Sequence, residues 1–234
     1  MKRLLNRLFF FLLGLAGLLS LIASIAAAQV TNPALMKEGF LQFSQTAHLQ
    51  VPASRYGEYA QAITRYLDGK TDAIQVPDPQ EDQALIPAFS EKENAHMRDV
   101  RRIVSALQWT RWIGGGGVIL ILLLLYLLRR GRRDQLLRCA TRGFAAASIA
   151  MLIAALALAL WGAANFRGLF WTFHQVVFTN DLWLLDPQTD LLMALMPLPF
   201  FTWYAGEIAK GLLPIAGVMA LVIIAYFKTK DQPS

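Results

Sequence analysis

Four long apolar runs are the feature of this 234-residue sequence that most restricts its fold. They cover residues 8–28, 112–128, 144–163 and 211–227. A helix rises about 1.5 Å per residue, so roughly 20 apolar residues are needed to cross a hydrocarbon core about 30 Å thick. The sequence therefore predicts a mainly α-helical, polytopic membrane protein with four transmembrane helices.

Lysine and arginine gather at three places beside these runs. They precede the first run at residues 2–7, crowd residues 129–142 with six arginines, and follow the fourth run at residues 228–230. Four spans place all three clusters on one side, which the positive-inside rule makes cytoplasmic. The net charge of +6 is thus a topology signal, and we expect no nucleic-acid partner.

The first run has a second interpretation. Its end, Ala26 to Gln29, resembles a signal-peptidase site, so a cleaved signal peptide is an alternative. An apolar stretch of about 20 residues is longer than the roughly 7–15 of a signal peptide, and its length favours a retained helix.

The runs divide the chain into seven expected parts. Residues 1–28 form the first transmembrane helix with its basic start, 29–111 an extracytoplasmic α+β or loop-rich cap, 112–128 the second helix, 129–143 a basic cytoplasmic loop, 144–164 the third helix, 165–210 an extracytoplasmic or interfacial aromatic segment, and 211–234 the fourth helix and cytoplasmic tail.

Three stretches of the cap have recognisable patterns. Apolar residues at helical spacing predict an amphipathic helix over Ser54 to Leu67, with Asp68-Gly69-Lys70 as its end. The proline-rich stretch from Thr71 to Pro87 predicts extended chain. The short apolar stretch from Phe40 to Phe43 is expected to form a strand or to pack onto the core.

A dense polar segment, residues 89–104, lies between the cap and the second run. Ser90 and Glu93 have the spacing of a capping box, which predicts a helix start. His96 follows, with Glu93 three residues before it and Asp99 three residues after, so both carboxylates share its face. They are candidates for orienting the imidazole, and helix capping and surface charge are the equal alternative.

Features beyond the cap give further expectations. The glycines at residues 114–117 allow either close helix contact or a local break. Small residues over 145–160 predict a tightly packed third helix. In the aromatic segment, Asp186-Pro187 predicts the start of a short helix that Pro197 ends.

Two of the three histidines are expected to meet. His96 precedes the second run and His174 follows the third, and these runs should be antiparallel neighbours. Paired imidazoles suit acid–base chemistry, because their ordinary pKa lies near neutral pH, or metal binding. No H-E-x-x-H spacing is present, so we expect no metal and no other cofactor. Cys139 lies on the arginine side, and His48 is expected to be structural.

The residues around the two histidines carry a resemblance. The segment SEKENAHMRDVRRI, with its E-x-x-H-M-x-D-V core, resembles the first signature of the bacterial lipoprotein intramolecular transacylases. The segment FHQVVFTNDLWLLDPQTDLLMALMPLPFF resembles the second signature. The order of spans and loops also resembles that family.

The resemblance implies an acyltransferase of the bacterial cytoplasmic membrane, with its active site on the extracytoplasmic face. The substrate would be a lipoprotein with a diacylglyceryl-modified N-terminal cysteine. The enzyme would move the sn-2 acyl chain to the cysteine α-amine, giving the lyso form, with membrane lipid as surroundings. The family's two essential histidines would correspond to His96 and His174.

Weaker candidates and other functions stay open at this level. Substrate contact or support of the site is expected from a set of polar and aromatic residues: Glu93, Asp99, Asn180, Asp181, Trp183 and Asp186. The alternatives are a histidine-dependent or metal-dependent lipid hydrolase or peptidase, and a non-enzymatic membrane scaffold. The sequence assigns no oligomeric state.

Overall fold

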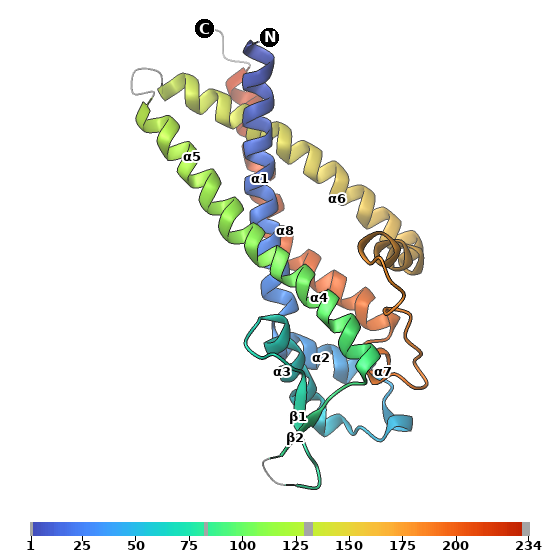
Figure 1. Ribbon diagram of the computed structural model, residues 1–234. Helices are drawn as coiled ribbons and strands as arrows, with labels where there is room; N and C mark the ends of the chain where they lie inside the picture. Colours follow the sequence, from blue (N-terminus) through green and yellow to red (C-terminus); the bar gives the residue numbers. More distant parts are fainter. Residues whose placement is uncertain (1, 82–83, 129–132, 231–234) are drawn as a thin grey trace. The chain divides into compact units, whose positions relative to one another are not determined.

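The computed structural model describes residues 2–81, 84–128 and 133–230. The described chain divides into two compact units. The first, the membrane unit, contains Met1–Ile25, Leu107–Ala164 and Lys210–Ser234. The second, the cap unit, contains Ala26–Ala106 and Asn165–Ala209. Several helices run from one unit into the other along the chain (Figure 1).

The membrane unit consists of helices. They are α1 (Lys2–Val30), the π-helical turn Thr110–Gly114, α5 (Gly115–Leu128), α6 (Arg133–Val177) and α8 (Leu198–Lys230). Four helices of the described chain are long and apolar enough to cross a membrane. The expected fold class, mainly α with four transmembrane helices, is confirmed.

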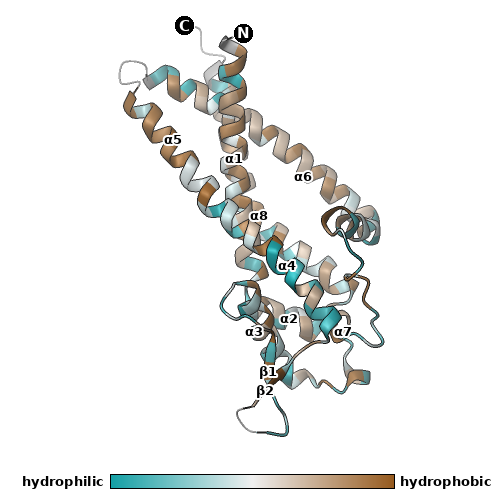
Figure 2. Cartoon of the chain, viewed as in Figure 1, coloured by the Kyte–Doolittle hydropathy of each residue, from teal (hydrophilic) through white to brown (hydrophobic). Residues whose placement is uncertain are grey.

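Helix α5 shows why a lipid environment is required. It is apolar all round and has no buried residue (Figure 2). Ile119 is 69% exposed and Leu128 is 80% exposed. Contiguous apolar surface of this kind is rare on soluble monomers, because water disfavours it, whereas lipid tails cover it at no such cost.

Close packing between α1 and α6 depends on two glycines. A Cβ on Gly143 would lie 2.4 Å from the backbone of Phe10, and a Cβ on Gly14 would lie 2.9 Å from the Cα of Phe144. Both distances are shorter than van der Waals contact, so only glycine permits this approach of the two backbones. Ala147 of α6 is fully buried beside this contact.

The third span is less enclosed than its composition suggests. Gly143, Ala145, Ala147 and Ser148 are buried in its first half, but Ile153, Leu156 and Leu160 are 60–64% exposed. The expected packed interior helix is therefore wrong for the second half of the span, where small residues and leucines face outward. The helix also begins at Arg133, so residues 133–143 are helical and not loop; residues 129–132 lie outside the described residues.

The glycine run combines both of its expected roles. The chain makes a π-helical turn at Thr110–Gly114, which is the local break. A Cβ on Gly115 would lie 2.8 Å from the Oγ of Ser20, which is the close contact. The Ser20 hydroxyl donates to the carbonyl of Arg111 at 2.9 Å, so the altered turn has a side-chain donor from α1.

The cap unit has short helices around one small sheet. Its elements are the end of α1, α2 (Pro33–Phe43), 3₁₀ turns at Ala47–Leu49 and Ala53–Arg55, α3 (Tyr56–Leu67), β1 (Gln75–Pro77), β2 (Leu85–Pro87), most of α4 (Glu91–Trp109), the end of α6, α7 (Leu191–Leu195) and the start of α8.

The apolar stretch at Phe40 belongs to a helix, so the strand alternative is wrong. Asn32 accepts hydrogen bonds from the backbone N–H groups of Ala34 and Leu35, and Pro33 occupies the first helical position. Both are strong helix-start signals. Phe40 is fully buried and packs against Tyr56 and Phe200, so the expected packing onto the core is confirmed.

Helix α3 forms as expected and supplies the cap core. Tyr59, Ile63 and Tyr66 are all buried on one face. The helix ends at Leu67 because Gly69 takes a positive φ of 75°, which glycine adopts without a Cβ penalty. The expected extended chain is also present, as the antiparallel pair β1–β2 in which Val76 lies opposite Ile86.

The short helix in the aromatic segment starts later than expected. Residues 186–189 form a turn, in which the Asp186 carboxylate accepts the backbone N–H of Gln188. Helix α7 begins only after Asp190 and ends before Pro197, so its predicted end is confirmed. The carboxylate of Asp190 turns back to the N–H of Asp186 and is not available to cap α7.

Candidate functional site

His96 lies on α4, one turn after a fully formed capping box. The Glu93 carboxylate accepts the N–H of Ser90 at 2.8 Å, and the Ser90 hydroxyl accepts the N–H of Glu93 at 3.3 Å. These bonds fix where α4 begins, and the 3.6-residue period then turns His96 to the buried side of the helix. The imidazole is 7% exposed.

His174 lies on the last part of α6, beyond a break at Asn165. The backbone of Asn165 has φ −155° and ψ 76°, so the helix is interrupted there. The Asn165 side chain accepts the N–H of Gly168 at 2.9 Å, which is the bond of an N-cap. Asn165 therefore starts a new helical segment, and this segment carries His174, which is 8% exposed.

The two imidazoles lie close together within the cap unit, in a tilted arrangement. Their ring centroids are 6.2 Å apart and their planes differ by 31°. The sequence analysis expected this approach from the topology alone. Both histidines lie outside the apolar runs 112–128 and 144–163 of the sequence.

The two rings differ in their hydrogen bonds. The Nδ1 of His174 lies 2.7 Å from the carbonyl oxygen of Phe170. A carbonyl only accepts, so Nδ1 carries the proton and the neutral ring keeps its lone pair on Nε2. The Nδ1 of His96 is buried and has no hydrogen-bond partner. A buried polar atom without a partner is costly, which makes this nitrogen a contact point for a ligand.

Burial keeps both imidazoles neutral. Desolvation is the main cause that lowers the pKa of His96 to about 4, and the nearby His174 lowers it further against the opposing charge of Asp99. Desolvation also lowers the pKa of His174, and its hydrogen bond to Phe170 opposes the shift. Neutral imidazoles accept protons, so both can act as bases at neutral pH.

Aromatic rings surround the pair. Phe178 lies 5.1 Å from His96 and 5.4 Å from His174 between ring centroids. Phe170 and Trp183 lie 4.2 Å and 5.0 Å from His174. The sequence analysis recognised the aromatic density, but it missed that Phe170 and Phe178 line the imidazoles. Their i−4 and i+4 spacing from His174 was the available signal.

Neither carboxylate beside His96 makes a hydrogen bond to its imidazole. Glu93 is 3% exposed and accepts the N–H of Leu192 at 2.6 Å in addition to its capping bond. Asp99 pairs with Arg102 at 2.7 Å and accepts from the side chain of Asn180 at 2.9 Å. Glu93 therefore acts as a helix cap and does not orient the imidazole. Asp99 influences His96 only through its charge.

The other candidates divide in the same way. Trp183 packs on His174, and Asn180 is tied to Asp99. Asp186 builds its own turn, and Asp181 contributes its carbonyl to Leu184. His48 is exposed, and its ring contacts the carbonyl of Pro187 at 3.0 Å. This contact does not involve His96 or His174.

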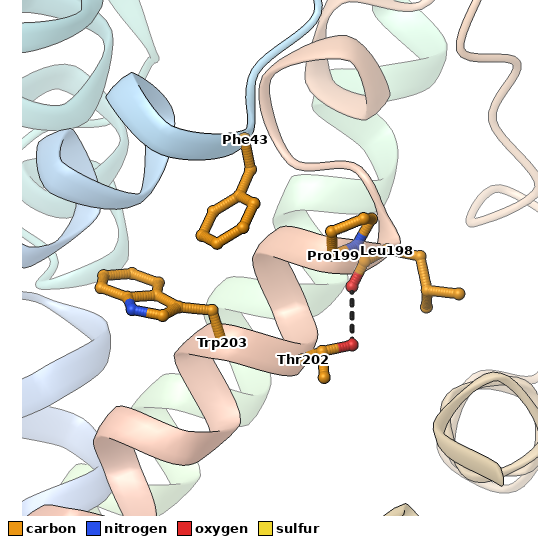
Figure 3. A pocket seen from close by; sticks show the side chains of 5 residues that line it. All are labelled: Phe43, Leu198, Pro199, Thr202 and Trp203. Carbon is orange, nitrogen blue, oxygen red and sulfur yellow. Dashed lines mark hydrogen bonds between the residues drawn. The ribbon is translucent and has the colours of Figure 1, made fainter.

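Among the described residues no group of three or more His, Cys, Asp or Glu side chains gathers to hold a metal ion. One apolar hollow of about 450 Å³ lies in the cap unit. Figure 3 shows Phe43 and Trp203 next to each other on one side of it, with ring centroids 5.8 Å apart, and Leu198, Pro199 and Thr202 on the other side. Neither histidine lines it.

The chain thus has the architecture of a four-helix membrane protein with paired, neutral imidazoles in an aromatic enclosure. The family profile of the lipoprotein intramolecular transacylase Lit matches residues 9–201. This is most of the sequence, and the chain belongs to that family. Its activity is an acyl transfer within a lipoprotein.

Solved structures agree with this fold. The chain is similar to the membrane-integral lipoprotein intramolecular transacylase Lit from Bacillus cereus, with 23% identity, a TM-score of 0.67 and 97% of each chain covered. A variant of that protein with a histidine replaced by arginine gives 21% identity and a TM-score of 0.61, covering 98% of this chain and 95% of that one. A search of curated proteins found no match.

Proposed function

We propose that His96 and His174 together catalyse O-to-N acyl transfer on a diacylglyceryl lipoprotein. The sn-2 acyl chain leaves the glycerol oxygen and joins the α-amine of the N-terminal cysteine, giving the lyso form. The observation that carries this assignment is the pair of neutral imidazoles 6.2 Å apart, each at most 8% exposed, within aromatic walls.

The bond changes need one proton to move. The neutral α-amine attacks the ester carbonyl carbon, a C–N bond forms, and the C–O bond to glycerol breaks. The amine proton is lost and the glycerol oxygen gains a proton, so the reaction balances without an outside donor. A base that accepts the first proton and returns it to the oxygen is sufficient.

His174 has the geometry of that base. Its Nδ1–H is held by the Phe170 carbonyl, so Nε2 is the lone pair that accepts the amine proton. The unpartnered Nδ1 of His96 then contacts the reacting ester or the departing glycerol oxygen. Preorganised donors of this kind stabilise charge on a tetrahedral oxyanion most strongly where water is excluded.

Binding both reacting groups of one molecule lowers the entropic barrier. An amine and an ester carried by the same substrate need only be oriented, and effective concentrations of oriented groups are very large. The enclosure by Phe170, Phe178 and Trp183 suits the acyl chain and the glycerol backbone, which are largely apolar.

The site belongs on the extracytoplasmic side under the same proposal. The basic clusters beside the apolar runs favour cytoplasmic termini, which places residues 29–111 and 165–210 on the opposite face. Diacylglyceryl lipoproteins are anchored at that face of the bacterial cytoplasmic membrane, with membrane lipid around them.

Single substitutions of the two histidines test the proposal. His96→Ala and His174→Ala should each lower conversion of a diacylated lipoprotein to its lyso form by at least 100-fold, measured by mass spectrometry in membranes. His48→Ala is the matched control, since it removes the remaining histidine of the chain and should leave conversion unchanged. Unaltered conversion in both variants, with normal membrane insertion, would overturn the mechanism.

A further inference from the structure

The enclosure raises a question of access. The imidazoles of His96 and His174 are 7% and 8% exposed, and a diacylglyceryl cysteine is far larger than the gaps that such burial leaves. A segment beside the site must therefore move for substrate to enter. The hydrogen bonds that hold each segment around the two imidazoles indicate which segment moves.

Residues 178–185, called the strap here, form one wall and contain no helix or strand. The strap carries Phe178, which contacts both imidazoles, and Trp183, which packs on His174. Helix α4 and the end of α6 have continuous backbone hydrogen bonds, whereas the strap has a few local ones, such as that from the N–H of Leu184 to the carbonyl of Asp181, and is attached to α4 through side chains. It is the wall that can move at the lowest cost.

Two exposed bonds attach the strap to one face of α4. The Lys92 ammonium donates to the carbonyl of Leu184 at 2.6 Å, and Asp99 accepts from the side chain of Asn180 at 2.9 Å. Lys92, His96 and Asp99 have i, i+4 and i+7 spacing, so the two bonds lie on either side of the imidazole. Solvent-exposed bonds are weak, because water competes for the same groups.

The chain after the strap is attached differently. Leu192 donates its N–H to the Glu93 carboxylate, which is 3% exposed. Breaking that bond would leave one oxygen of a buried carboxylate and a buried N–H without partners, which is costly. The chain is therefore held firmly at Leu192, after the strap, by a buried bond. The strap itself is held to α4 by exposed bonds that can break more easily.

From this difference we infer that Asp99 and Asn180 are a latch, which positions Trp183 and Phe178 over the two imidazoles and releases the strap to admit the diacylglyceryl group. The inference rests on the proposed function only for the identity of the substrate. Access to the imidazoles is a property of the protein alone.

The side chain of Asn180 allows a sharp test. Its Oδ1 accepts the N–H of Leu182 within the strap, and its Nδ2 donates to Asp99. Asn180→Asp keeps the first bond and removes the donor of the second. The exchange Asp99→Asn combined with Asn180→Asp restores a donor facing an acceptor in the opposite direction.

Histidine modification by diethylpyrocarbonate measures opening without substrate. The purified full-length protein in detergent micelles is treated, and modification of each of its three histidines is followed by peptide mass spectrometry. We expect Asn180→Asp to raise the rates at His96 and His174 about fivefold, as for loss of one exposed charge-assisted bond. His48 is exposed and serves as the internal reference for reagent activity.

The double exchange should return both rates to those of the parent protein. Asp99→Ala provides a second route to the open strap and should give the same rise as Asn180→Asp. No rise in either single variant, or a rise that the double exchange does not reverse, would overturn the latch. Loss of acyl transfer in the histidine variants is a separate result, so failure of the latch and failure of the proposed function are distinguishable.

Discussion

The carboxylate of Glu93 joins the starts of two helices that are 100 positions apart in sequence. One oxygen accepts the N–H of Ser90 at the start of α4, and the other accepts the N–H of Leu192 at the start of α7. The first N–H groups of a helix have no intrahelical partner, so a single buried side chain satisfies donors at both ends. It lies one turn before His96.

Glu93→Gln should therefore destabilise the cap unit more than an ordinary capping change. Glutamine has one accepting oxygen, and its amide would face a backbone N–H, so we expect a loss of about 2–3 kcal/mol. Thermal unfolding in detergent micelles measures it. Ser90→Ala is the matched control, because it removes only the capping hydroxyl and should cost about 1 kcal/mol. Equal losses in the two variants would refute the double role of Glu93.

Asn165 should matter to catalysis through His174. Asn165→Ala removes the cap of the helical segment that carries this histidine, at a cost of about 1 kcal/mol. Because that segment would start less sharply, we expect a reduction in kcat with little change in KM. Asn165→Asp retains an accepting oxygen toward Gly168 and should recover most of the activity. An unchanged kcat in the alanine variant would show that the break is not needed.

Packing of α1 against α6 should fail when Gly143 gains a side chain. A Cβ there would lie 2.4 Å from backbone atoms of Phe10, so Gly143→Val should lower the unfolding temperature strongly or prevent folding. Gly116→Ala is the control from the same unit, since no atom lies within 4 Å of its added Cβ. Alanine there should be neutral or slightly stabilising. Similar behaviour of both variants would contradict the close approach.

The pH dependence of the reaction should show titration of the substrate α-amine alone. Histidines with ordinary pKa values would add a second titration. The proposed mechanism requires a neutral α-amine, whose ordinary pKa is about 7.7–8.0, and a neutral imidazole. Burial lowers the pKa of His96 to about 4 and also lowers that of His174. A group with a lowered pKa stays neutral as the pH falls, so log(kcat/KM) should decline with a slope near one between pH 7 and pH 5. A slope near two below pH 6.5 would show imidazoles with ordinary pKa values.

The sequence predicted the arrangement of spans better than the contacts of the site. Apolar length and basic flanks follow from the bilayer and from charge, so they are readable in a single chain. His96 and His174 were expected to meet because antiparallel neighbouring spans return the chain to the same face. Helix α7 was placed too early because Asp186-Pro187 has the form of a helix start, yet the carboxylate of Asp186 closes a local turn.

Long-range partners explain what the sequence did not predict. Glu93 and Asp99 share a helix face with His96, and helical periodicity alone indicates contact with the imidazole. The structure instead directs them to Leu192 and Asn180, which belong to a segment more than 80 positions away. Such bonds depend on how the return segment folds, and local spacing carries no information about it.

The aromatic walls around His96 and His174 have a consequence for the fate of the acyl chain. An activated ester has two competing nucleophiles, the cysteine amine and water, and water outnumbers the amine in any open site. Imidazoles that are at most 8% exposed leave little room for water, so under the proposed function the amine should capture the acyl group. We then expect the ratio of amide formed to free fatty acid released to depend on Phe170, Phe178 and Trp183 more than on the two proposed bases.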